Sequence, residues 1–245
     1  MKSSVETFGW KTLVFLAALA GLAAYWFWLR PECKKAGALA CPADPAIEEG
    51  VGTALSAREV CRGAGYLCVG RKMPFQVIRW PLDKGRLRIR ATLPDFIHGP
   101  DAEEIRDAAV EGILQWNNQP FPIVVEKSVA FRWDINVNWT QGLNMEAVGV
   151  ANPAWNIKNK RVEYWFQGMG IMVPPASSMS RQARHAWVRA IAAHEMGHAL
   201  GLMFHSDRRS DIMFPNINNA PPGPSDRDFQ TLEALYALPN GAMVQ

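Results

Sequence analysis

The sequence predicts an α+β domain that follows an apolar N-terminal segment. Strand-like alternation recurs after residue 73, helical spacing recurs between these strands, and an uncharged run of 18 residues precedes both. The chain has 245 residues, of which 49% are hydrophobic and 20% charged, so a sizeable packed core is expected and global disorder is excluded. The net charge of +3 is too small to indicate a nucleic-acid partner, and we expect none.

The uncharged run covers residues 12–29 and has basic residues on both sides. At 1.5 Å per residue it would span about 27 Å, enough for a thin bilayer. Four consecutive aromatic residues, Tyr25–Trp28, suit a membrane interface and favour an uncleaved signal anchor. A signal peptide cleaved near Ala18–Ala20 is the alternative. We expect residues 1–30 to be a signal anchor or signal peptide, and the protein to be extracytoplasmic, either membrane-anchored through residues 12–29 or secreted.

All the cysteines lie between the apolar run and residue 70: Cys33, Cys41, Cys61 and Cys68. An even, clustered count beside an export signal indicates two disulfides and an oxidising compartment. Three connectivities are open, and the local one pairs Cys33 with Cys41 and Cys61 with Cys68. A zinc knuckle is disfavoured by the wide spacings. A free Cys61 thiolate that blocks an active site is a further alternative.

The regular elements begin with residues 86–92, where apolar side chains alternate with charged or polar ones, the period of a half-buried strand. Pro100 then opens a helix predicted over residues 101–117. Apolar residues recur in this helix at helical spacing and define one core-facing side. They are Ile105, Ala108, Ala109, Gly112, Ile113 and Trp116.

The rest of the domain is predicted to hold three further strands and two helices. The strands are expected at residues 123–125, 133–139 and 161–166. A long helix is expected over residues 181–200, and Ser225 is expected to cap a final helix. The apolar residues of that final helix would pack back on the core; they are Phe229, Leu232, Leu235 and Tyr236.

One segment of the long helix carries the chemistry, His194-Glu195-Met196-Gly197-His198. Four residues advance about 400° around a helix, so both imidazoles point the same way, one turn apart. Two nitrogen ligands need this geometry to bind one metal ion. Glu195 lies beside them and can reach a metal-bound water without being a ligand itself. Gly201 ends the helix and lets the chain turn back, so that His205 completes the three protein ligands of a catalytic zinc.

This segment resembles the metzincin zinc proteases, most closely the matrixin branch. The resemblance rests on His194-Glu195-x-x-His198-x-x-Gly201, on His205-Ser206 and on Ile212-Met213-Phe214-Pro215. The family has two residues between the glycine and the third histidine, whereas this chain has three: Leu202, Met203 and Phe204. A single inserted residue explains the departure, because the Met-turn methionine still falls eight residues after His205. His205 is therefore the expected third ligand, with Asp207 as the alternative.

The resemblance implies a twisted mixed sheet with an active-site helix, a C-terminal helix and a substrate cleft beneath an edge strand, for which residues 161–166 are the candidate. It makes residues 73–245 the metalloprotease domain, residues 31–72 a pro-segment or stalk, and Met213 the apolar floor beneath the metal. Only His98 and His185 remain elsewhere in the chain, so a second zinc site of histidines is not expected. Calcium sites stay unassigned.

The function implied is that of a zinc-dependent endopeptidase with one catalytic Zn²⁺. A zinc-bound water would attack the peptide bond of a protein or peptide substrate, with Glu195 as the general base. Two alternatives stay open at this point. One is a catalytically inactive metzincin-like binding module, and the other is a zinc amide hydrolase that acts on cell-wall peptides.

Overall fold

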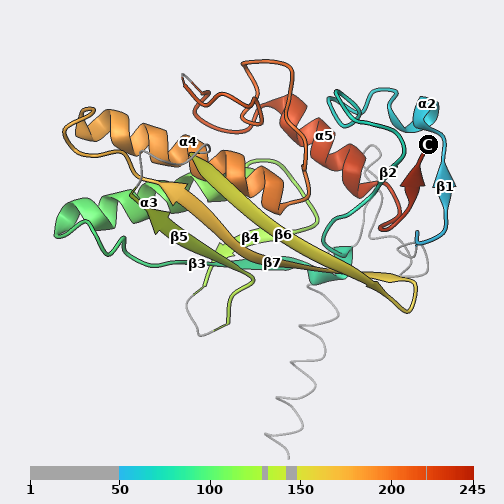
Figure 1. The fold of residues 1–245 in the computed structure, drawn as a ribbon, viewed down its shortest axis with the longest axis horizontal. Coiled ribbons are helices and arrows are strands. Elements are labelled where there is room, and N and C mark those ends of the chain that lie inside the picture. The colour runs from blue at the N-terminus through green and yellow to red at the C-terminus, as the bar shows by residue number, and fades with distance from the viewer. Residues whose placement is uncertain (1–49, 129–131, 142–147, 219) are drawn as a thin grey trace, which may run out of the picture. The chain divides into compact units, whose positions relative to one another are not determined.

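The computed structural model describes residues 50–128, 132–141, 148–218 and 220–245 (Figure 1). The apolar run at 12–29 and the cysteines Cys33 and Cys41 lie outside the described residues, so the predictions made for them are not tested. Across the described ranges, no helix has the length and apolar character that a membrane span requires.

The main sheet has five strands in the order β4-β3-β5-β7-β6. Neighbours among β4, β3, β5 and β7 run parallel, whereas β6 is antiparallel to β7 and forms a long hairpin with it. The edge next to β7 is therefore the antiparallel strand. The strands are β3 (Arg86–Ala91), β4 (Val124–Lys127), β5 (Ile135–Thr140), β6 (Gly149–Lys158) and β7 (Arg161–Met172).

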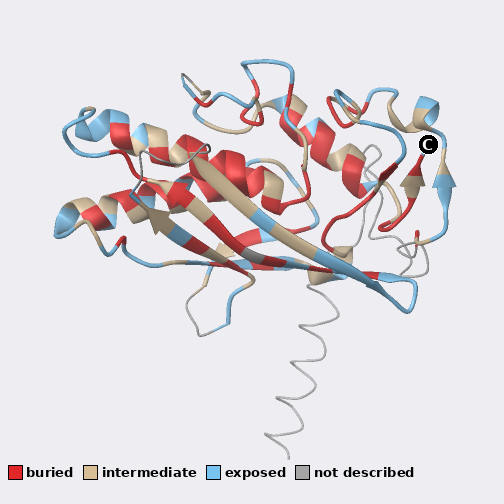
Figure 2. Cartoon of the chain, in the orientation of Figure 1, coloured by how far each residue is buried: buried red, intermediate tan, exposed pale blue. Residues whose placement is uncertain are grey.

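Helices α3 (Pro100–Leu114) and α4 (Arg181–Ala199) lie side by side along the sheet (Figure 1). The predicted apolar side of α3 is buried, from Ile105 to Trp116, and the buried residues gather where both helices face the sheet (Figure 2). Helix α3 continues as a 3₁₀ turn at Gln115–Asn117, and a second 3₁₀ turn spans Leu82–Lys84. The predicted α+β class and both long helices are thus confirmed.

Helix α5 (Asp226–Tyr236) closes the domain with the apolar face that the sequence predicts. Its N-terminus is a capping box, because the Ser225 side chain accepts a hydrogen bond from the Asp228 backbone and the Asp228 side chain accepts one from the Ser225 backbone. The predicted final helix and its Ser225 cap are confirmed.

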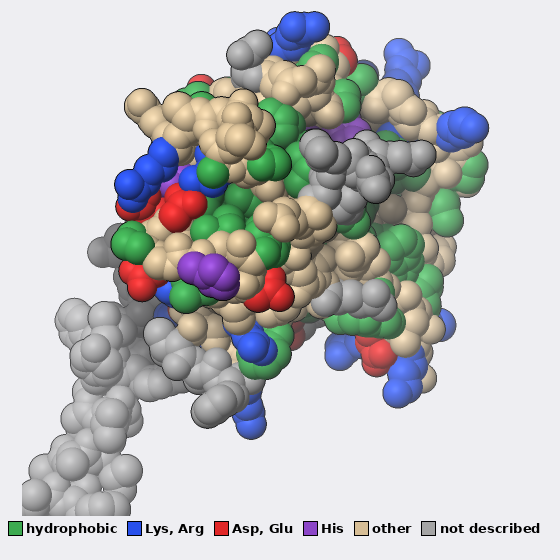
Figure 3. Space-filling view, turned by 60° about the vertical axis from the view of Figure 1, so that its left-hand side comes forward, with side chains coloured by type: hydrophobic (Ala, Val, Ile, Leu, Met, Phe, Trp, Pro, Cys, Tyr) green, Lys and Arg blue, Asp and Glu red, His purple; other side chains and the backbone are tan. Residues whose placement is uncertain are grey.

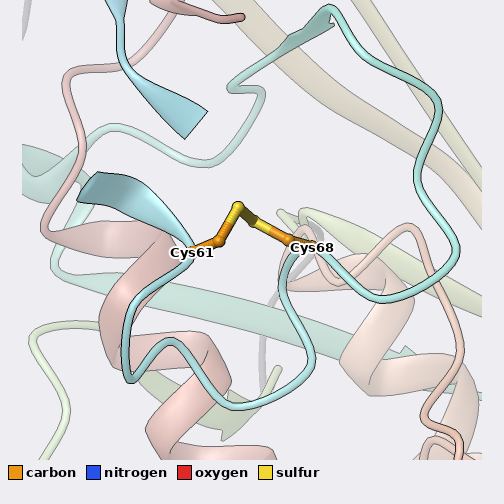
Figure 4. Close-up of a disulfide and its surroundings, with 2 residues drawn as sticks. All are labelled: Cys61 and Cys68. Carbon is orange, nitrogen blue, oxygen red and sulfur yellow. A yellow bond between two sulfur atoms is a disulfide. The ribbon is translucent and has the colours of Figure 1, made fainter. Parts of the chain in front are cut away.

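A second, three-stranded sheet joins the two ends of the described chain. The C-terminal strand β8 (Met243–Val244) lies between β1 (Ala54–Leu55), which runs parallel to it, and β2 (Phe75–Gln76), which runs antiparallel. Helix α2 (Ala57–Val60) follows β1 and leads into the Cys61–Cys68 disulfide (Figure 4). From residue 50 onward, the segment predicted to be a pro-segment or stalk therefore packs against the C-terminal part of the chain.

One prediction about the strands needs correction, and one strand was not predicted. The edge-strand candidate, residues 161–166, belongs to β7, which lies between β5 and β6, so the prediction was wrong and the edge strand is β6. Strand β6 has no alternating pattern in the sequence, because Asn152 and Pro153 interrupt the alternation and a register shift occurs at that point. An edge strand with solvent on one side tolerates a proline that an inner strand does not.

Candidate active site

The last turns of α4 carry His194, Glu195 and His198. Both His194 and Glu195 are about 5% exposed, so the motif is presented from inside the fold rather than from its surface. The helix ends at Ala199, and two residues later Gly201 has a φ of +109°, a backbone conformation that residues with a side chain rarely adopt. The chain reverses there and returns with His205.

The three histidines converge on one point. Their ligand nitrogens all lie within 4.8 Å of one another. The ring centroids are separated by 4.9 Å for His194 and His198, 5.2 Å for His194 and His205, and 5.0 Å for His198 and His205. His205, which follows the three-residue turn, therefore lies beside the two helix histidines as predicted.

Hydrogen bonds fix the protonation pattern of the two helix histidines. His194 Nδ1 lies 2.7 Å from the Ile212 carbonyl oxygen, and His198 Nδ1 lies 2.6 Å from the Leu202 carbonyl oxygen. A carbonyl only accepts, so each Nδ1 donates its proton and each Nε2 keeps a lone pair. Such backbone partners orient metal-binding imidazoles, so the donor set fits a zinc ion.

Desolvation keeps the imidazoles of His194 and His198 neutral at physiological pH. Desolvation lowers the pKa of His194 to about 4 and that of His198 to about 3, and the proximity of the other histidines acts in the same direction. Burial also lowers the pKa of His205. A neutral imidazole is the form that binds a metal, so the site does not have to release protons from these rings.

Glu195 lies against the first residue of β6. A Cβ atom on Gly149 would come within 2.3 Å of Glu195 Oε1, so only glycine leaves room for the carboxylate. In the metal-free protein, burial raises the pKa of Glu195 to about 8. A nearby cation favours the charged carboxylate, and a carboxyl group with a pKa in this range can both take up and release a proton near neutral pH.

The Met213 side chain is fully buried beneath α4. A Cβ atom on Gly197 would meet Met213 Sδ at 2.3 Å and the Trp116 ring at 2.8 Å, so the glycine between the two helix histidines makes space for the methionine. The Trp116 indole N–H donates to the Ala193 carbonyl oxygen at 2.8 Å and fastens α3 to the same stretch of α4.

Asp228 of α5 supports the Met213 turn from behind. Its side chain accepts hydrogen bonds from the Ile212 and Met213 backbone N–H groups at 2.8 and 3.4 Å, and it is fully buried. The Tyr66 hydroxyl donates to the same carboxylate at 2.7 Å. The Ile212 carbonyl oxygen, which accepts from His194, is therefore held by a network that reaches back to the Cys61–Cys68 loop.

Asp207, the alternative third ligand, points to a different partner. Its carboxylate pairs with Arg227 at 2.7 Å and is not among the groups that converge with His194 and His198. Arg227 also pairs with the buried Asp211 at 2.8 Å, and Asp211 accepts a hydrogen bond from Ser206. These aspartates hold the loop after His205 in place.

The histidines and Glu195 line a cleft of about 620 Å³ beside the edge strand. One wall comes from the start of β6, the floor from α4, and the opposite wall from the segment after Met213. The lining residues are Val148, Gly149, Val150, Ala151, Trp187, His194, Glu195, His198, His205, Pro215, Asn216, Ile217 and Asn218. An edge strand beside a metal-binding triad leaves backbone groups free to pair with an extended chain.

A second group of titratable residues, Asp101, Glu104 and His185, lies where α3 and α4 begin. Both carboxylates are engaged by arginines: Arg184 pairs with Asp101 at 2.7 Å and Arg181 pairs with Glu104. Acidic, basic and histidine side chains are mixed on the face that Figure 3 brings forward. Two guanidinium groups already balance these carboxylate charges. The cluster of Asp101, Glu104 and His185 therefore joins the two helices as an ion-pair network rather than as a metal centre.

Sequence reasoning missed several residues that shape the site. Gly149 has no local signal, because the contact that requires a glycine comes from Glu195, 46 positions away. The capping pattern beginning at Ser225 places Asp228 at a helix start, but nothing in it points to the Met213 turn or to Tyr66.

Comparison with known protein families agrees with the geometry. A sequence model of the Matrixin family matches residues 101–237, more than half of the chain and the whole stretch from α3 to α5. No curated protein matches the chain. The matched region contains the converging histidine triad, with Glu195 beside it and Met213 beneath. The chain therefore belongs to the matrixin family of zinc-dependent metalloendopeptidases.

Proposed function

We propose that His194, His198 and His205 hold the catalytic zinc ion of this matrixin and that Glu195 is its general base. The observation that carries the proposal is the convergence of three imidazoles beside a buried carboxylate on the floor of the cleft. When bound, zinc would polarise the scissile carbonyl and make a nearby water more acidic. The remaining roles belong to the chain itself.

Glu195 takes the proton from the attacking water and passes it to the nitrogen of the departing amine. The carboxyl group is confined between α4 and Gly149, so little motion separates its two tasks. Pro215 stands two residues after Met213 and offers neither a hydroxyl nor an N–H donor. Stabilisation of the developing oxyanion by the protein would then rest on backbone N–H groups of the cleft.

The substrate is a protein or peptide segment in extended conformation, bound by strand addition to the start of β6. Residues Gly149–Ala151 line the cleft and belong to the edge strand, which supports this mode of binding. The apolar walls at Val148, Trp187 and Ile217 would receive a substrate side chain.

The protein acts outside the cytoplasm in this proposal. Matrixins are typically secreted, and the Cys61–Cys68 disulfide requires an oxidising compartment. Residues 1–30 would serve as a signal anchor or signal peptide, and residues 31–72 as a pro-segment or stalk ahead of the protease domain. Cys61 is in a disulfide, so it is not a free thiolate that could block the site.

Replacing the general base gives the sharpest test. Glu195→Ala should lower kcat by at least about 10²-fold, within the usual contribution of a general base, while bound zinc stays at one equivalent. Glu163→Ala, a change of an exposed glutamate on β7, is the matched control and should leave both quantities at the wild-type value. Wild-type turnover in Glu195→Ala would remove this residue from the mechanism.

A further inference from the structure

In the turn that leads to His205, some residues are hydrogen-bonded and others are not. In its first two residues, the Leu202 N–H donates to the Gly197 carbonyl and the Met203 N–H donates to the Gly201 carbonyl. After it, the Ser206 N–H donates to the Met213 carbonyl oxygen at 2.8 Å. Within the described part of the chain, Phe204 and His205 make no hydrogen bond, whether through backbone or side chain.

Phe204 is instead held by a cation from another part of the chain. The Arg71 guanidinium carbon lies 3.7 Å from the centroid of the Phe204 ring and 3.9 Å from the centroid of the Phe75 ring. Contacts this short bring a desolvated cation against the negative face of each ring, the geometry of a strong cation–π interaction. Phe75 is buried in β2, so the Arg71 side chain links the turn to the small sheet.

Arg71 is a partly buried cation without a carboxylate partner among the described residues. Burial lowers its pKa to about 9, so the guanidinium keeps its charge at neutral pH. Its Nε is buried without a hydrogen-bond partner among the described residues, and no described carboxylate pairs with it. The residue follows the Cys61–Cys68 loop, and its backbone N–H donates to the Cys68 carbonyl oxygen at 3.4 Å. The Arg71 charge therefore interacts with the Phe75 and Phe204 rings rather than with a carboxylate among the described residues.

We propose that Arg71 is a positioning residue for the third metal ligand: by linking the Phe204 ring to the Phe75 ring through its guanidinium, it fixes a turn that is one residue longer than the family pattern and so places His205 beside His194 and His198. The proposal rests on the assignment of His205 as a zinc ligand made above. His194 and His198 need no such device, because helix α4 and their carbonyl partners orient both rings. His205 depends on the residues on either side of it.

The test compares zinc affinity in the full-length chain and in Arg71→Leu. Competition with a chelator of known affinity gives the dissociation constant, and the visible spectrum of the cobalt(II)-loaded protein reports the ligand geometry. Arg71→Leu should bind zinc about tenfold or more weakly, the usual effect of removing a residue that orients a ligand, and its cobalt spectrum should change. Arg71→Lys should recover only part of the affinity, since an ammonium group does not stack on two rings as a planar guanidinium does.

A matched control is available on the main sheet. The Arg90 guanidinium lies 4.2 Å from the centroid of the Trp133 ring, and neither residue lines the cleft. Arg90→Leu should keep the wild-type zinc affinity and cobalt spectrum. If Arg71→Leu does not fold, Phe204→Leu removes the ring from the same contact and should weaken zinc binding in the same way.

A double variant separates the failure of this proposal from the failure of the ligand assignment. If Arg71 acts through His205, adding Arg71→Leu to His205→Ala should not weaken zinc binding further. Unchanged zinc affinity in His205→Ala would overturn the ligand assignment itself. A normal loss in His205→Ala with wild-type zinc affinity and cobalt spectrum in Arg71→Leu would overturn the positioning role, even if the melting temperature of Arg71→Leu falls.

Discussion

The two parts of the proposed zinc-binding site differ in how they obtain their geometry. In helix α4, the spacing of His194 and His198 alone puts both rings on one side, and two backbone carbonyls then set their orientation. In the turn that follows, His205 has no hydrogen bond within the described chain, and its position depends on contacts made by Phe204 and Ser206. Local sequence determines the first region, whereas distant segments determine the second.

Removing a helix ligand should have the largest effect. His198→Ala deletes a ring that is oriented by the Leu202 carbonyl, so zinc affinity should fall by more than about 100-fold, the upper range for outer contacts of a ligand. Equilibrium competition with a chelator measures the change. His98→Ala, a change of an exposed histidine outside the cleft, should bind zinc as the wild type does. An affinity within tenfold of the wild type in His198→Ala would contradict the role of the helix pair.

The contact between Gly149 and Glu195 should control turnover rather than zinc binding. Gly149→Ala places a Cβ atom 2.3 Å from Glu195 Oε1 and must displace the carboxylate or the edge strand. A shift of about 1 Å at a catalytic group can cost up to about 10²-fold in rate, so kcat should fall by about 10- to 100-fold with zinc content unchanged. The control Gly170→Ala meets nothing closer than 3.8 Å and should be active. Full activity in Gly149→Ala would show that the base is not confined there.

In the metal-free protein, the titratable groups of α4 should make the unfolding free energy depend on pH. Below pH 6.5 the unfolded chain binds protons on His194 and His198 that the folded chain rejects, because their folded pKa values are about 4 and about 3. Glu195 acts in the opposite sense, since its folded pKa of about 8 lets the folded chain hold a proton that the unfolded chain releases above 4.5.

The two effects predict a maximum of stability. Between pH 4.5 and 6.5 the two histidines outweigh Glu195, so the unfolding free energy should rise with pH. Between pH 6.5 and 8 the histidine contribution fades and Glu195 outweighs it, so the unfolding free energy should fall. The fall should stay below about 1.4 kcal/mol per pH unit, the slope that one whole proton would give, because the histidines still oppose it. Urea unfolding of the metal-free chain across this range measures the curve. Glu195→Gln should abolish the fall above pH 6.5, and an identical curve in this variant would contradict the assignment.

The sequence predicted those elements whose pattern is local. Helix α4 and its motif, the apolar side of α3 and the Ser225 cap all follow from spacing within a few residues, and each agrees with the structure. Strand β6 was missed because Asn152 and Pro153 interrupt its alternation, and residues 161–166 were placed at the edge for the same reason.

The parts that the sequence did not predict depend on contacts between distant segments. Gly149 is required by Glu195, and the Met213 turn is supported by Asp228 and Tyr66. The longer turn before His205 is contacted through its Phe204 ring by Arg71, which lies more than a hundred positions earlier in the chain. No periodicity or short motif contains such information, because each pairing exists only once the chain has folded.

The most direct test of the zinc assignment is a crystal structure of the zinc-loaded full-length chain with anomalous diffraction at the zinc edge. The zinc assignment predicts one anomalous peak on the floor of the cleft, about 2.0–2.1 Å from a ring nitrogen of each of His194, His198 and His205. A peak ligated by Asp207 in place of His205, or a peak bound away from these three histidines, would contradict it.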